Sequence, residues 1–155
     1  MAKFKMGVLV PAGATVTARL GSAANAGGNI TDAEVGKFVK LAGDSQYDAV
    51  AVTNAIEGVV AARGPATANG WSIGSVTTAG RIACICDGLQ ATPGTGTIAV
   101  GDLVVAGTIV AKGTALTTGP KVCKATAQTA AVFNWRVVSL GNAGAVGDTC
   151  IIEKV

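Results

Sequence analysis

The sequence contains no histidine, so the side chain most often used as a general base near neutral pH is absent, and so is the commonest metal ligand. A nucleophile activated by a neighbouring histidine is therefore excluded. Aromatic residues make up only 4% of the chain and charged residues 14%, against a usual charged share of about 25%. We predict that the chain is not an enzyme and has no catalytic, cofactor-binding or metal-binding residues.

Long hydrophobic runs and clusters of positive charge are also missing. The longest apolar stretch, around residues 103–111, is far shorter than the roughly 20 residues that a transmembrane helix needs. The 12 lysines and arginines give a net charge of +3 but are scattered singly, whereas a nucleic-acid surface needs clustered cations. We expect neither a membrane nor a nucleic acid as partner. The first apolar run ends at Pro11 and is shorter than the core of a signal peptide, which favours a protein made in the cytoplasm.

Short segments rich in β-branched residues dominate the sequence. Valine and isoleucine together number 29 against seven leucines, and turn signals such as Asn69-Gly70 and Gly147-Asp148 recur at short intervals. Short strands between regular breakers predict an all-β fold, a small β-barrel or β-sandwich with Gly-rich turns and little helix. The predicted strands are 5–10, 15–20, 37–41, 48–53, 57–62, 72–77, 81–86, 102–105, 121–125, 134–140 and 148–154.

The predicted organisation is an N-terminal arm, residues 1–30, followed by one β domain, residues 31–155. A weak internal repeat runs through the domain, over about 35–89 and 100–155, and each copy begins with a G-(K/D)-x-V segment. The offset between the copies changes from 65 to 70 residues, so the second copy would carry an insertion within 108–132. Because glycine, alanine and valine are so abundant, chance similarity is the alternative explanation.

The four cysteines do not have the spacing of a metal site. Cys84 and Cys86 are separated by one residue, whereas a zinc knuckle has two to four, and Cys123 and Cys150 lie far along the chain. We therefore predict four buried free thiols that behave as small hydrophobic side chains.

The remaining distinctive residues also have structural interpretations. Asp102 and Asp148 each follow a glycine and Asp87 precedes one, which is typical of a carboxylate that bonds to backbone in a turn. Trp71 and Trp135 are the largest side chains in an aromatic-poor chain. We predict that they anchor the core, with anchoring of an interface as the alternative.

Four segments carry a family resemblance: VGKFVKLAGDSQYDAVAVTNAIEGVVAA, NGWSIGSV, GDLVVAGTIVAKGTALT and WRVVSLGNAGAVGDTCIIEKV. Through them the chain resembles the head decoration, or cement, proteins of tailed bacteriophages, from about residue 35 to its end. The likeness rests on composition, on the paired G-(K/D)-x-V segments and on their spacing. It implies a structural virion protein on the outer capsid surface, with the major capsid protein as partner and neither catalytic residues nor a cofactor. Members of this family attach as homotrimers, or less often as dimers or monomers, so a homotrimer is the expected form.

The N-terminal arm is the candidate capsid contact, and completion of the barrel is the alternative role for it. It combines neighbouring positive charges with a compact apolar run, and an added strand gains main-chain hydrogen bonds whatever its side chains. The candidate contact residues are Lys3, Phe4, Lys5, Met6, Val8 and Val10. The alternative function is a β-module of a virion spike or fibre that binds a host-surface glycan.

Overall fold

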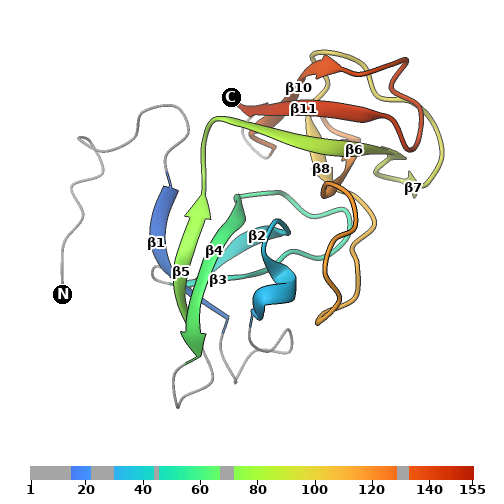
Figure 1. Ribbon diagram of the computed structural model, residues 1–155. Helices are drawn as coiled ribbons and strands as arrows, with labels where there is room; N and C mark the ends of the chain where they lie inside the picture. The colour runs from blue at the N-terminus through green and yellow to red at the C-terminus, as the bar shows by residue number, and fades with distance from the viewer. Residues whose placement is uncertain (1–14, 22–29, 44–45, 67–71, 129–132) are drawn as a thin grey trace.

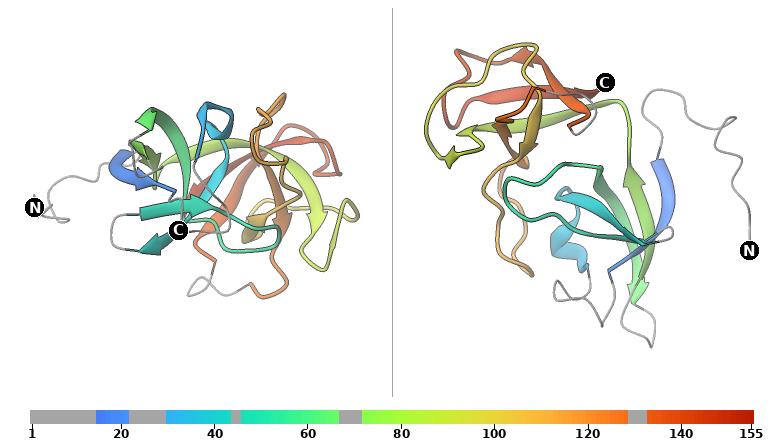
Figure 2. Two further views of the ribbon diagram at one scale, coloured as in Figure 1. Left: turned by 90° about the horizontal axis from the view of Figure 1, so that it is seen from below. Right: turned by 180° about the vertical axis from the view of Figure 1, so that it is seen from behind.

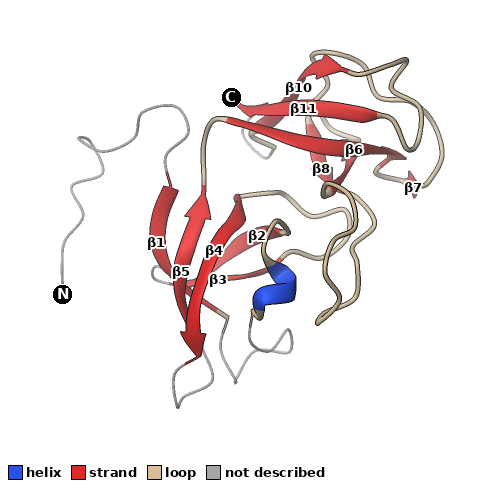
Figure 3. Cartoon of the chain, viewed as in Figure 1, coloured by secondary structure: helices blue, strands red, loops and turns tan. Residues whose placement is uncertain are grey.

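The computed structural model describes residues 15–21, 30–43, 46–66, 72–128 and 133–155. The all-β prediction is confirmed, since the described chain is built of strands and one short 3-10 turn (Figure 3). In chain order the elements are β1 (Thr15–Leu20), η1 (Asp32–Glu34), β2 (Phe38–Gly43), β3 (Gln46–Ala49), β4 (Gly58–Ala66), β5 (Ser72–Thr77), β6 (Arg81–Leu89), β7 (Thr92–Pro93), β8 (Val104–Ala106), β9 (Lys121–Lys124), β10 (Trp135–Leu140) and β11 (Thr149–Lys154). No helix in the described part of the chain is long and apolar enough to cross a membrane.

The first five strands close into a small barrel, here called the first barrel. Its strand order is β1-β3-β2-β4-β5, and β1 then pairs with β5 along its whole length. The β1/β3 contact is parallel and the other ladders are antiparallel. In Figure 1 this barrel lies below the remaining strands, and β5 runs up into β6.

The later strands form a second sheet of order β10-β11-β6-β9-β8, to which β7 adds a short pair with β6. An isolated bridge between Leu103 and Arg136 brings the β8 end of this sheet to β10, so the second sheet also curls towards closure. Figure 2 shows the same two-part arrangement from below and from behind.

The two halves share one pattern of strand pairing. The parallel pair β1/β3 corresponds to β6/β9, and the antiparallel pairs β1/β5, β2/β3 and β4/β5 correspond to β6/β11, β8/β9 and β10/β11. The registers match as well, so residues paired in these ladders in one half have counterparts in the other. Counterparts include Val16 and Ile82, Ala18 and Cys84, Leu20 and Cys86, Val39 and Val104, Val60 and Val137, and Val76 and Ile152.

The G-(K/D)-x-V segments hold the same place in each half. The Gly36 amide donates to the Val60 carbonyl at 2.8 Å, and the Val60 amide donates to the carbonyl of Lys37 at 3.0 Å. Gly101 and Val137 make the same two bonds, at 2.8 and 2.9 Å, the second to the residue that follows Gly101. A register shift follows both valines in their ladders to β5 and β11. The segments noticed in the sequence are thus equivalent structural elements.

Successive side chains of a strand point to opposite faces of its sheet, and the side chains that point inward form the hydrophobic core. One buried cluster fills the first barrel: Ala18, Leu20, Ile30, Val39, Val60 and Val76. The largest cluster fills the second sheet around Trp135, and Phe38, Val50 and Ile56 from the first half pack into it. The two halves therefore share a hydrophobic core.

The structure corrects the predicted boundaries. Residues 15–20 form β1 inside the first barrel, so the arm does not extend to residue 30 and the barrel begins before residue 31. By strand pairing the two corresponding units run over 15–77 and 81–154, not 35–89 and 100–155. The predicted strand at 5–10 lies outside the described residues. The short 3-10 turn η1 carries a capping box formed by Thr31 and Glu34.

Candidate functional site

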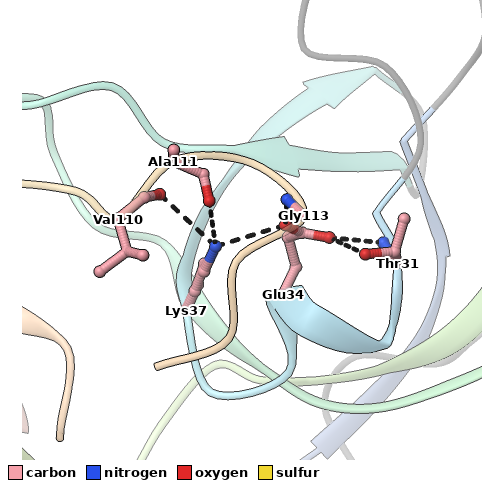
Figure 4. Close-up of polar contacts among 6 residues, drawn as sticks. All are labelled: Thr31, Glu34, Lys37, Val110, Ala111 and Gly113. Carbon is pink, nitrogen blue, oxygen red and sulfur yellow. Dashed lines mark hydrogen bonds and ion pairs between the residues drawn. The ribbon is translucent and has the colours of Figure 1, made fainter. Parts of the chain in front are cut away.

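An inserted loop distinguishes the second half from the first. Two residues connect β2 to β3, but fourteen residues, 107–120, connect the equivalent strands β8 and β9. We call residues 107–120 the strap. The predicted insertion within 108–132 thus falls mainly on the strap, which lies against the first barrel beside η1 (Figures 1 and 4).

The two ends of the strap lie side by side and form its neck, which is held by Asp87, a buried residue of β6. The Thr108 amide donates to Asp87 Oδ2 at 2.6 Å, and Lys121 Nζ lies 3.5 Å from Asp87 Oδ1. The Gly107 amide also donates to the Lys121 carbonyl at 2.8 Å. Burial would raise the pKa of Asp87, but the bonds from Thr108 and the charge of Lys121 outweigh it, so the pKa is lowered. One carboxylate therefore joins the start of the strap to the first residue of β9, which follows the strap.

The tip of the strap is fastened by Glu34 at the end of η1. The Gly113 amide donates to Glu34 Oε1 at 2.7 Å. The Thr31 amide donates to Oε2 at 2.7 Å, and the Thr31 hydroxyl bonds to the same oxygen. Lys37 Nζ lies 3.3 Å from Oε1 (Figure 4). The buried carboxylate thus links the capping box of the first barrel to a backbone amide of the second half.

Lys37 adds a second set of contacts between the first barrel and the strap. Its ammonium donates to the carbonyls of Val110 and Ala111, at 3.4 and 3.1 Å, besides its contact with Glu34 (Figure 4). An ammonium has three protons, so these three acceptors satisfy it. We call the Glu34–Lys37 pair and its strap contacts the clasp.

The clasp sets the ionisation of Glu34. Burial alone would raise the pKa of this carboxyl, but the bonds from Thr31, from the Gly113 amide and from Lys37 outweigh it and lower the pKa to about 2. Glu34 is therefore ionised over the whole physiological range.

A cavity of about 320 Å³ lies between the strap and the first barrel. Its floor comes from residues around η1, β2 and the end of β3, and its roof from both limbs of the strap. Its apolar lining includes Ile30, Phe38, Val50, Ile109, Leu116 and Pro120. Glu34, Lys37, Lys112 and Lys121 are the ionisable side chains that line it.

The described carboxylates are all engaged by other groups of the chain. Asp102 and Asp148 accept hydrogen bonds from the amides three residues earlier, Ala99 and Ala145, at 2.8 and 2.9 Å, which confirms their predicted turn role. The partner of Asp87 is distant in sequence, so for that residue the expected local turn is wrong. The others contact Arg63, Gln46, the Leu41 amide and Arg81.

The four cysteines are buried and unpaired, as predicted. Cys84, Cys86 and Cys150 belong to the large buried cluster around Trp135, whereas Cys123 lies beside Asp87. Burial raises the pKa of Cys123 and of Cys150 to about 12, and it also raises those of Cys84 and Cys86. Within the described ranges, no group of three or more Cys, Asp or Glu side chains is arranged to hold a metal ion.

The other predicted site residues fall into two groups. Trp135 is fully buried in the largest hydrophobic cluster, so its predicted role as a core anchor is confirmed. Trp71 and the candidate contacts Lys3, Phe4, Lys5, Met6, Val8 and Val10 lie outside the described residues.

The sequence pattern alone indicated neither the clasp nor the role of Asp87. The signal that pointed towards them was the change in repeat offset, which indicated an insertion without showing what the inserted residues would contact.

Comparison with family models, curated proteins and solved structures gives no match.

Proposed function

We propose that this chain is a structural virion protein that binds the outer surface of an assembled phage capsid and stabilises it, and that it is not an enzyme. The observation that carries the proposal is the equivalence of the two G-(K/D)-x-V segments. They bear the resemblance to decoration proteins, and each makes the same pair of backbone bonds in its half of the molecule. The feature behind the resemblance is therefore part of the architecture and not an accident of composition.

The use of polar groups also supports a structural role. The eight described carboxylates accept bonds from turns, strands, the strap or neighbouring cations. Several large aliphatic side chains remain exposed on both halves, among them Leu41, Ile73, Val100, Ile151 and Val155. Such a surface suits binding through many weak apolar contacts repeated over a lattice.

The proposed mechanism is mass action. A protein that binds only the assembled shell stabilises that shell by its binding free energy, and a homotrimer raises the effective affinity further. The partner is the major capsid protein, and the N-terminal residues Lys3–Val10 are the proposed contact.

Sedimentation with empty capsids of the parent virus tests the proposal. The protein should co-sediment with assembled capsids, saturate at a fixed number of copies per particle and raise the temperature at which the capsids open. Free capsid subunits are the control, because a lattice-specific protein should not bind them. Failure to bind assembled capsids under these conditions would refute the function.

A further inference from the structure

We propose that the cavity beneath the strap is a binding site for an apolar monocarboxylate, such as a medium-chain fatty acid, with its carboxylate at Lys112. The volume, about 320 Å³, is that of a small-molecule pocket. The proposal does not depend on capsid binding, because the site is formed within one chain.

The lining selects an apolar body for the ligand. Ile30, Phe38 and Val50 form the floor, while Ile109 and Leu116 come from the two limbs of the strap. Ile109 is 47% exposed, so the roof offers aliphatic surface that an alkyl chain would cover.

The charges select the head group. The ammonium of Lys37 already has three acceptors, and the carboxylate of Glu34 already accepts bonds from Thr31, Lys37 and Gly113, so neither residue of the clasp needs a ligand. Lys121 is paired with Asp87. Lys112, which is exposed, has no ion-pair partner among the described residues. The surplus charge of the lining is thus positive, and it is located on the strap.

The anchoring of the strap keeps the site formed. Asp87 holds its neck and Glu34 its tip, so the roof does not have to be ordered when a ligand arrives. A site formed in advance avoids part of the entropic cost of binding.

Titration of the full-length protein with decanoate, followed by amide chemical shifts, tests the proposal, with decanol as the uncharged probe of equal length. We expect decanoate to shift the amides of lining residues and to bind more tightly than decanol. Lys112→Glu should weaken decanoate binding about fivefold, as an exposed ion pair allows, and should leave decanol binding unchanged. Lys154→Glu is the matched control, since it makes the same charge change on β11, outside the lining.

A second variant tests the location. Ala51→Phe places a ring at the edge of the cavity and should reduce the binding of both probes. Three results would overturn the proposal: no shift at millimolar decanoate, equal binding of decanol and decanoate, or equal effects of Lys112→Glu and Lys154→Glu. None of these results bears on capsid binding, so the two proposals fail separately.

Discussion

Leu20 and Cys86 occupy equivalent positions in the two halves, but the space beside them is filled in different ways. Leu20 lies against Gly74, where an added Cβ would come within 2.4 Å of the leucine Cδ1. Cys86 lies close to Cys150, the counterpart of Gly74. A large and a small residue in one half are thus replaced by two residues of intermediate size in the other.

This exchange of volumes predicts the effect of Gly74→Cys. The new side chain should collide with Leu20 and with the Ala62 carbonyl, and should lower the free energy of unfolding by about 1–3 kcal/mol. Adding Leu20→Cys should recover part of the loss, since the collision with the leucine is then relieved and only the close contacts with the backbone of Ala62 and Arg63 remain. Denaturant titration measures both variants, with Ser75→Cys on the same strand as control. Strictly additive effects of the two substitutions would contradict the equivalence.

Much of the fold was predictable because it depends on local signals. The strands Thr15–Leu20 and Ser72–Thr77 were predicted with their observed bounds, since β-branched alternation and flanking breakers coincide there. The buried Trp135 was also predicted, because composition favoured the core over an interface for the largest side chains of an aromatic-poor chain.

The clasp was not predictable, because it joins groups far apart in sequence. Glu34 and Gly113 are separated by 79 residues, and Asp87 and Thr108 by 21. Nothing in the local sequence of the strap indicates that it contacts the first barrel. The parallel β1/β3 and β6/β9 contacts were equally hidden, since strand alternation does not reveal neighbours.

The clasp predicts a pH dependence of stability. The pKa of Glu34 is about 2 in the folded protein against an ordinary value of 4.5, so its stabilisation is complete above about pH 5 and is lost as the pH falls towards 2. The loss should amount to about 3 kcal/mol at most. Denaturant titration between pH 7 and pH 2 measures it.

Glu34→Gln is the control for this dependence. It should lower stability at pH 7 by about 2–4 kcal/mol, because Lys37 is left buried without its counterion, and it should flatten the curve between pH 5 and 2. Adding Lys37→Met should restore part of the lost stability. If the curve of Glu34→Gln falls as steeply as that of the natural protein, Glu34 is not the responsible group.

The thiols should be inert in the folded protein. All four are buried, and burial raises each pKa, so almost no thiolate forms at pH 8. A colorimetric disulfide reagent should therefore react with no thiol of the native protein and with four after unfolding in guanidinium chloride. Rapid reaction of even one thiol under native conditions would show that the cores open readily.

Deletion of residues 1–10 tests the proposed capsid contact. The truncated protein should keep its β-type circular dichroism spectrum, because β1 begins at Thr15, but it should no longer co-sediment with capsids. Substitution of both Lys3 and Lys5 by Gln should weaken binding less than the deletion does and should make it less sensitive to salt. A truncated protein that still decorates capsids normally would move the docking surface to another part of the chain.

The most direct test of the central claim is the copy number of this protein in purified particles of the parent virus, measured by quantitative mass spectrometry against the major capsid protein. A decoration protein should be present at a copy number comparable to that of the capsid subunit and should be released without loss of the shell. Its absence from particles, or its presence at only the few copies expected of a spike, would contradict the account.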